Sequence, residues 1–417
     1  MEWHARRHLV TAALLVPMAV LAPRIYVPVD VQRIPLARLS ANLQRAMRAE
    51  PRNPQWVHNL ARAHAMAWST RTQDVPIMAG YTPGFTPPRP GATESDRRRA
   101  ADSAVQNATA VWFGHESAAV PFTQVVAVAD SSRLRAARAH LDTALALYAR
   151  AIALDSNDLT SRLGQAWLLS QTPNRTAAIA QLRVIIEDFP KTEARASSNR
   201  SIFSQSLLAE AARYLIPLLH PARNRVEINK LEQQIREEER RPRAVTPIAI
   251  PLVNATSAGD LEDRTAAVTF DADGTGLPKR WSWIRPNAAW LVHDPHRTGR
   301  ITSALQLFGS VTFWMFWRSG YDALASLDDN HDGALRGREL DGLALWHDAN
   351  SNGISERGEV RPVSFYGIVS LSCTGSRDAD HPDRILHAPA GVTYRDGTTR
   401  STYDFVLHER PRAGAYP

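Results

Sequence analysis

The sequence predicts a mainly α protein with a helical N-terminal half and a C-terminal domain that mixes helices with strands. Apolar residues recur at helical spacing from Leu36 to about Glu237. The segment Pro247-Ile-Ala-Ile-Pro251 then marks a boundary, because two prolines interrupt regular structure. Beyond it, the apolar run 266–270 is typical of a strand, and aromatic residues become frequent.

The helical half is expected to contain hairpins of paired helices. One helix begins at Leu36, ends before Pro51, and is followed by a second that begins near Val57. A longer helix from Leu134 returns through residues 163–167, and a further helix stops at Pro190. The order Leu163-Gly164, Trp167, several alanines and Pro190 resembles a tetratricopeptide repeat, and this resemblance implies close helix packing and a concave surface for a protein partner. A plain helical scaffold is the alternative.

Composition and charge indicate an ordinary globular protein. The chain is 44% apolar and 22% charged, with a net charge of +7 that comes largely from arginines spread along the predicted helices. No nucleic-acid motif accompanies the basic run 236–243, which also contains acids, so we expect no nucleic-acid partner. The single cysteine, Cys373, has no disulfide partner in the chain and is expected to fill apolar space.

Two twelve-residue segments, 328–339 and 348–359, have the spacing of calcium loops. Such a loop supplies side-chain oxygens from positions 1, 3, 5 and 12 and a backbone carbonyl from position 7, with glycine at position 6 for the sharp turn. A polar turn without a metal is the alternative for one such run, but two in tandem favour calcium. The expected ligands are Asp328, Asn330, Asp332, Ala334 and Glu339 in the first loop, and Asp348, Asn350, Asn352, Ile354 and Glu359 in the second.

The two loops are not equivalent. The first has three carboxylates among its main ligand positions and the second has two, so the first is expected to bind calcium more tightly. Residues 340–347 are expected to form one short helix between the loops. Two degenerate loops precede them, beginning at Asp271 and Asp294; each lacks an acid at the twelfth position, so both are expected to be structural turns. Phe313, Trp314, Phe316, Trp317 and Tyr321 recur at three- and four-residue steps, which predicts a buried helix leading into the first loop.

Four segments together resemble the EF-hand-like calcium-binding domains of large secreted bacterial proteins. They are Phe270-Asp-Ala-Asp-Gly-Thr-Gly276, Leu307-Phe-Gly309, the run 320–328 and Leu345-Trp-His-Asp-Ala-Asn350. The resemblance covers residues 264–372 and implies calcium at the ligands named above, but no reaction.

The sequence therefore predicts four regions. Residues 1–23 form an export signal or a membrane anchor, 35–243 a tetratricopeptide-like helical domain with a loop at 68–100, 244–251 a linker, and 252–410 an EF-hand-like domain. The predicted function is that of an exported calcium-binding protein with a helical interaction or scaffold domain. A hydrolase with a calcium-stabilised domain remains open, because a pair of acids needs no motif. A dockerin-like module is less favoured, because residues 362–371 are typical of a turn into a strand.

Export can be tested directly. Arg6 and Arg7 precede an apolar run, 9–22, that is the length of a signal core and short for a membrane span. A fusion of the full chain to a reporter active only outside the cytoplasm should score positive, and deletion of residues 1–23 should abolish the signal. Reporter activity confined to the cytoplasm would contradict export.

Overall fold

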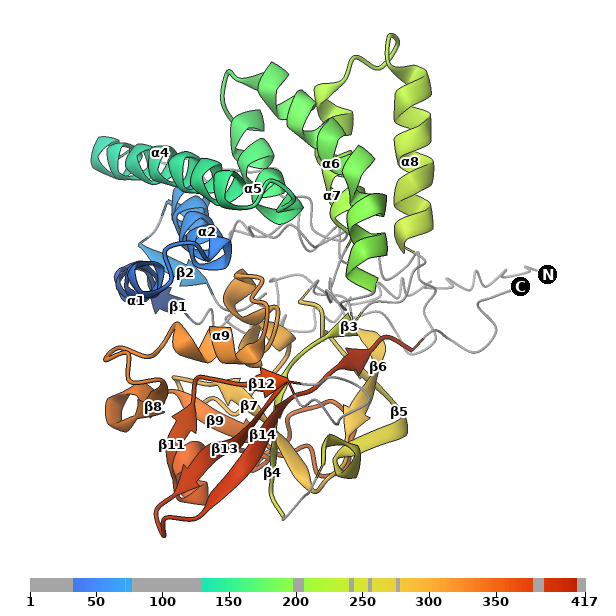
Figure 1. The fold of residues 1–417 in the computed structure, drawn as a ribbon. Coiled ribbons are helices and arrows are strands. Elements are labelled where there is room, and N and C mark those ends of the chain that lie inside the picture. The colour runs from blue at the N-terminus through green and yellow to red at the C-terminus, as the bar shows by residue number, and fades with distance from the viewer. Residues whose placement is uncertain are drawn as a thin grey trace, which may run out of the picture.

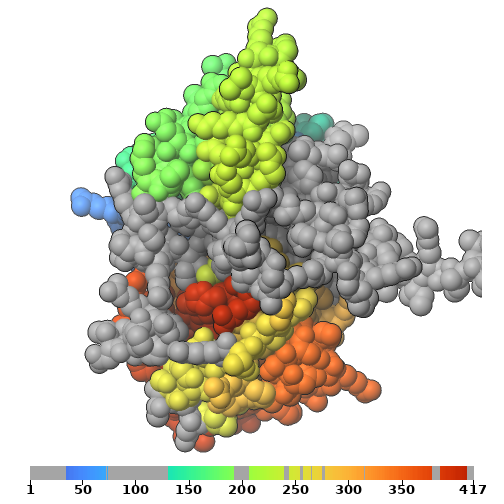
Figure 2. Space-filling model, turned by 90° about the vertical axis from the view of Figure 1, so that its right-hand side faces the viewer, coloured from blue at the N-terminus to red at the C-terminus, as the bar shows by residue number. Residues whose placement is uncertain are grey.

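The protein has a helical layer that lies over a β-sheet domain (Figure 1). The computed structural model describes residues 33–71, 73–76, 130–197, 206–239, 244–253, 257–274, 278–377 and 386–410. The predicted export segment and most of the predicted loop 68–100 lie outside these ranges. Among the described helices, none is both long enough and apolar enough to cross a membrane. The side view in Figure 2 shows the same two layers.

Helices account for most of the described residues from Leu36 to Glu239. They are α1 (Leu36–Ala49), α2 (Pro54–Thr70), α4 (Ser131–Leu154), α5 (Leu159–Ser170), α6 (Arg175–Ser197), α7 (Leu207–Leu215) and α8 (Arg225–Glu239). Short polar residues cap several of them: Asn53, Asp130, Asp158 and Ser206 each accept a hydrogen bond from a backbone N–H of the first turn. Gly164 lies against the ring of Tyr148, where an added Cβ would come within 2.4 Å, so only glycine allows α4 and α5 to approach this closely.

The prediction of a mainly α protein was wrong, because the C-terminal domain consists mostly of strands. The main sheet has the order β10-β9-β7-β4-β14-β13-β11-β8, and β12 also pairs with β13. The strands of the domain are β3 (Ala244–Val245), β4 (Ile248–Pro251), β5 (Glu262–Phe270), β6 (Lys279–Ile284), β7 (Ala288–His293), β8 (Ala334–Arg336), β9 (Leu343–Trp346), β10 (Val360–Pro362), β11 (Ile368–Ser372), β12 (Ser376–Arg377), β13 (Leu386–Tyr394), β14 (Thr399–Asp404) and β15 (Leu407–His408). Two short strands, β1 (Arg33–Pro35) and β2 (Asp74–Pro76), pair beside the helices.

The expected linker 244–251 is instead part of this domain. It forms β3 and β4, and β4 lies between β7 and β14 in the middle of the sheet. Its residues Ile248, Ala249 and Ile250 are buried, as both faces of a central strand require. The prolines that suggested a linker stand at the ends of this triplet, where a missing N–H does not interrupt the ladder.

Aromatic side chains form the core of the domain. Trp283 packs edge-to-face on Phe270, Trp290 and Trp346, with ring centroids 5.2–5.8 Å apart. The expected burial of Phe313, Trp317 and Tyr321 is confirmed, but the continuous helix is not. A 3₁₀ turn at Thr312–Trp314 and a separate helix α9 (Gly320–Ala325) are present instead, and Phe313 and Phe316 adopt positive φ angles that no α-helix accommodates.

Helix α2 is one of the helices that contact the domain. Asn59 donates to the carbonyl of Met315, Gln55 donates to that of Phe316, and the guanidinium of Arg62 lies 4.0 Å from the centre of the Phe316 ring. These contacts reach the segment between the 3₁₀ turn and α9, where the irregular backbone leaves carbonyl groups available. Helices α1, α2 and α4 therefore share one hydrophobic core with the sheet, whereas α5 to α8 pack mainly around a second core of their own.

Gly309 provides a test of the packing inside the sheet domain. A Cβ at this position would lie 1.9 Å from the carbonyl oxygen of Thr246, a backbone atom that cannot move aside. Gly309→Ala should therefore lower the free energy of unfolding by about 1–3 kcal/mol, the usual cost of overpacking. Gly259→Ala is the matched control, because its new Cβ would make only an ordinary 3.6 Å contact. Equal melting temperatures of the two variants in calorimetry would contradict this close contact between Gly309 and Thr246.

Candidate metal centre

The first predicted loop, 328–339, forms a closed ring of hydrogen bonds. The carboxylate of Asp328 accepts from the backbone N–H groups of His331 at 2.6 Å and Gly333 at 2.9 Å. Glu339 folds back across the ring and accepts from the N–H groups of Asp329 at 2.8 Å and Asn330 at 3.1 Å. The acids at positions 1 and 12 are thus both anchored to the ring backbone.

The remaining expected ligands of the first loop are less enclosed. Asn330 accepts from the N–H of Asp332, and Asp332 accepts from that of Ala334, so positions 3 and 5 form successive side-chain turns. The second oxygen of Asp332 pairs with the guanidinium of Arg336 at 2.5 Å. Both side chains of this pair are exposed, so it contributes little stability and a divalent cation can replace it.

The second predicted loop, 348–359, closes in the same way. Asp348 accepts from the N–H groups of Asn352 at 3.0 Å and Gly353 at 2.9 Å, and Glu359 accepts from that of Ala349 at 3.0 Å. Asn350 accepts from Asn352, and Asn352 accepts from Ile354, which is 61% exposed. Each of the two loops therefore brings its position 1, 3, 5 and 12 side chains onto one ring.

Two tryptophans hold the acids of the second loop, and sequence reasoning missed both. Trp283 donates its indole N–H to Asp348 at 2.8 Å, and Trp346 donates to Glu359 at 3.4 Å. Burial raises the pKa of Asp348 above its ordinary value, although the N–H groups of Gly353 and Asn352 and the indole of Trp283 oppose this effect. The aromatic clustering was visible in the sequence, but nothing in it indicated which indoles would face the loop.

Three of the loop acids are buried without a cationic partner. Asp328, Glu339 and Asp348 are 3%, 6% and 4% exposed, and none of them forms an ion pair with a basic side chain of the described residues. A carboxylate uses only part of its acceptor capacity in accepting two or three N–H bonds, so lone pairs remain for a cation. Among the described residues, no group of three histidine, cysteine or acidic side chains is close enough to form a metal site on its own.

The expected helix between the loops was wrong. Residues 337–340 form a 3₁₀ turn and Leu343–Trp346 form strand β9, because these apolar residues are buried on both faces of the sheet. The loops lie at opposite edges of the main sheet. Residues 334–336 of the first loop form the edge strand β8, and the second loop leads directly into the other edge strand, β10. Consequently the two loops do not pair with each other.

The degenerate loop at Asp294 closes like the other two but is satisfied internally. Asp294 accepts from the N–H groups of Thr298 and Gly299 at 2.9 and 2.8 Å. The side-chain amide of Gln306 donates to the carbonyl of Arg300, the position 7 oxygen that a calcium loop would give to its ion. The N–H of Ile301, at position 8 of this loop, donates to the hydroxyl of Ser355, at position 8 of the second loop, at 2.8 Å.

The degenerate loop at Asp271 has an ammonium group beside its acids. The Nζ of Lys279 lies 2.6 Å from the buried Asp273 and 3.8 Å from Glu409. Burial acts to lower the pKa of Lys279, but the charges of Asp273, Glu409 and Asp271 outweigh it and raise that pKa. Residues 275–277 of this loop lie outside the described ranges.

The comparisons with known proteins give a different family from the one expected. Residues 259–408 match the SPM domain. The iron-regulated protein FrpA of Neisseria meningitidis serogroup C is 31% identical to this chain over 150 residues, which are 34% of this chain and 13% of that protein. The chain thus spans only a small part of this relative.

The expected membership of an EF-hand-like calcium-binding family, preceded by tetratricopeptide-like repeats, is therefore wrong. The matched family is the SPM domain, and the matched region is mostly β-sheet, whereas an EF-hand requires a helix on each side of its loop. Only the six-residue α9 precedes the first loop, and strands follow both loops. The spacing of residues within a loop does not distinguish an EF-hand from other folds, because it specifies the ring and not the helices or strands on each side of it.

The ammonium of Lys279 should be essential to its loop. Lys279→Met removes the ammonium group that pairs with the buried Asp273 and should lower the free energy of unfolding by about 3 kcal/mol. Because the folded-state pKa of Lys279 is raised, this contribution is fully present below the unfolded-state pKa of about 10.4 and disappears as pH rises through the folded-state value. Chemical denaturation from pH 6 to 11 measures both effects.

Lys191→Met is the matched control for Lys279→Met. Lys191 pairs with Asp188 at 2.8 Å, but both side chains are exposed, so this substitution should change stability by less than about 1 kcal/mol. Equal effects of the two substitutions would show that the Lys279 pair is no stronger than a surface pair.

Proposed function

We propose that this chain is a calcium-binding protein whose loops 328–339 and 348–359 each hold one ion at an edge of the sheet. One observation carries the proposal: both loops close in the same way. In each, the position 1 aspartate accepts from the position 6 glycine N–H at 2.9 Å, and the position 12 glutamate accepts from the position 2 N–H. Two separate segments adopt one ring geometry, and each ring contains a buried acid without a cationic partner.

Calcium suits these rings better than other common metals. The oxygen donors are carboxylates, side-chain amides and backbone carbonyls, which hard cations prefer, and no ring contains a cysteine. Magnesium requires nearly ideal octahedral geometry, which a flexible twelve-residue ring does not impose. The ligands would be Asp328, Asn330, Asp332, the carbonyl of Ala334 and Glu339 in the first loop, and Asp348, Asn350, Asn352, the carbonyl of Ile354 and Glu359 in the second.

The proposed role of the ions is to stabilise the sheet domain. A cation offsets the cost of burying the acids, and a ligand that binds only the folded state raises the free energy of unfolding by about 2.7 kcal/mol at a hundred times its dissociation constant. An exported protein would meet calcium levels that fill sites with dissociation constants of about 10⁻⁴–10⁻³ M. Export, and a partner-binding or scaffold role for the helices, remain predictions.

Calcium should raise the melting temperature of the full chain. An increase of about 5–10 °C is expected at millimolar calcium, and a chelator should reverse it. Magnesium at the same concentration should have a much smaller effect. A melting temperature that stays constant across millimolar calcium would refute the proposal.

The two ions can be separated by substitution of the position 12 glutamates. Glu339→Gln should abolish the tighter of two binding phases in isothermal titration, and Glu359→Gln the weaker one, because each removes a chelating carboxylate. Glu232→Gln, at an exposed position of α8, makes the same change of charge and should leave both phases intact. Loss of the weaker phase in Glu339→Gln would reverse the ranking of the loops.

A further inference from the structure

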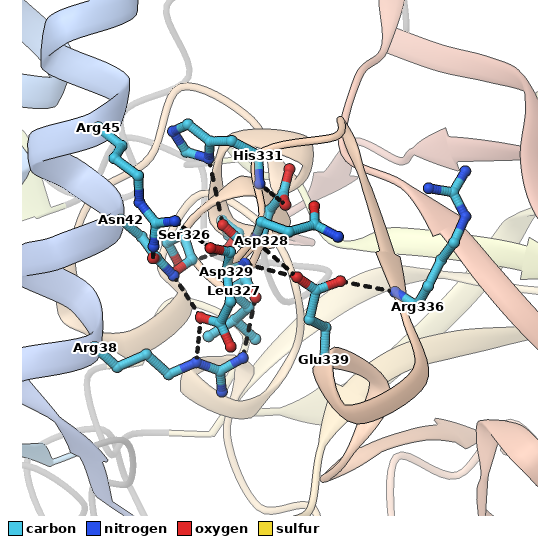
Figure 3. Close-up of polar contacts among 12 residues, drawn as sticks. Arg38, Asn42, Arg45, Ser326, Leu327, Asp328, Asp329, His331, Arg336 and Glu339 are labelled. Carbon is cyan, nitrogen blue, oxygen red and sulfur yellow. Dashed lines mark hydrogen bonds and ion pairs between the residues drawn. The ribbon is translucent and has the colours of Figure 1, made fainter.

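Helix α1 is hydrogen bonded to the first loop and to the two residues before it, and the longest of these contacts joins residues 291 positions apart (Figure 3). Arg38 donates to the carboxylate of Asp329 at 2.9 Å and to the carbonyl of Leu327 at 3.0 Å. Asn42, which is buried, donates to the same carboxylate and to the carbonyl of Ser326, both at 2.9 Å. Arg45 donates to the backbone carbonyl of Asp329. Three successive turns of α1 thus donate hydrogen bonds to residues 326–329.

These contacts leave the expected ligands free for an ion. Asp329 stands at position 2 of the loop, and Ser326 and Leu327 precede the loop, so none of the accepting groups belongs to positions 1, 3, 5, 7 or 12. The helix therefore holds the loop from outside the ring. The loop can therefore bind a calcium ion while α1 stays hydrogen bonded to it.

Asp329 connects the two partners directly. Its side chain and carbonyl accept from α1, while its own N–H donates to Glu339, the glutamate at position 12. Burial acts to raise the pKa of Asp329, but the hydrogen bonds from Arg38 and Asn42 outweigh it and keep that pKa below its ordinary value. When α1 fixes the position of Asp329, it therefore also fixes the N–H group that Asp329 donates to Glu339.

We propose that calcium binding in the first loop and the docking of α1 on the sheet domain favour each other. This inference rests on the proposed calcium binding and adds a regulated contact between the two layers. A ligand that binds an already ordered loop loses less conformational entropy, and the coupling must act equally in both directions. Repulsion between Arg38 and the ion is small, because Arg38 forms a neutral pair with Asp329.

Asn42→Ala tests the coupling without a change of charge. It removes one hydrogen bond to Asp329 of the loop and one to Ser326 just before it, and in the full chain it should raise the calcium dissociation constant of the first loop about fivefold. Isothermal titration in a Glu359→Gln background isolates this loop. The second loop, titrated in a Glu339→Gln background, should be unaffected by Asn42→Ala.

Gln165→Ala is the matched control, because Gln165 also donates a side-chain amide to a carbonyl, that of Leu145, within the helical layer. It should leave both dissociation constants unchanged. Arg38→Met is the second variant and gives a test of sign. Simple electrostatics predicts tighter calcium binding when this positive charge is removed, whereas the coupling predicts weaker binding.

The reverse direction is measured by amide hydrogen exchange of α1. Calcium should slow exchange in residues 40–49 about fivefold in the wild-type chain and should have no effect on them in Glu339→Gln. If the wild-type chain binds no calcium, the proposed function fails. If it binds calcium, but Asn42→Ala leaves the affinity unchanged or calcium leaves exchange in α1 unchanged, the coupling alone is refuted.

Discussion

A carboxylate enclosed by the N–H groups of its own turn is the interaction on which the C-terminal domain depends. Asp294, Asp328 and Asp348 each accept from the glycine N–H five residues later, and each is buried. The glycine adopts a positive φ in every case, which lets the backbone curl around the acid. This ring turns the chain sharply between strands, but it also places a negative charge where water cannot fully solvate it.

The domain deals with this charge differently at each loop. Gln306 and Thr298 satisfy the loop at Asp294 with neutral donors, and the ammonium of Lys279 accompanies the acids at Asp271 and Asp273. At the remaining two loops the buried acids Asp328, Glu339 and Asp348 form no ion pair with a basic side chain of the described residues, and calcium is proposed to supply the cation. Two loops are therefore satisfied by side chains of the protein itself, and the other two keep oxygen-bearing groups at each expected ligand position.

The sequence predicted local features better than the architecture. The rings were predictable because Asp, Asn, Gly and Glu at fixed offsets act within twelve residues, and Cys373 is buried as expected. The strand β9 was not, because Leu343, Leu345 and Trp346 suit a helix or a strand equally until their neighbours are known. The hydrogen bonds from Arg38 and Asn42 to the first loop and the residues before it join segments almost 290 residues apart, and no local sequence pattern predicts such a contact.

The position of β4 has a consequence for how the chain folds. This strand is the first in the main sheet along the chain, yet one of its two neighbours is β14, so that Ala249 pairs with Tyr403. Its other neighbour, β7, is synthesised early, but the edge of β4 that faces β14 has no partner until nearly the whole domain has been made. The sheet is thus closed by contacts of very long sequence separation, which slows folding and prolongs the exposure of an apolar strand.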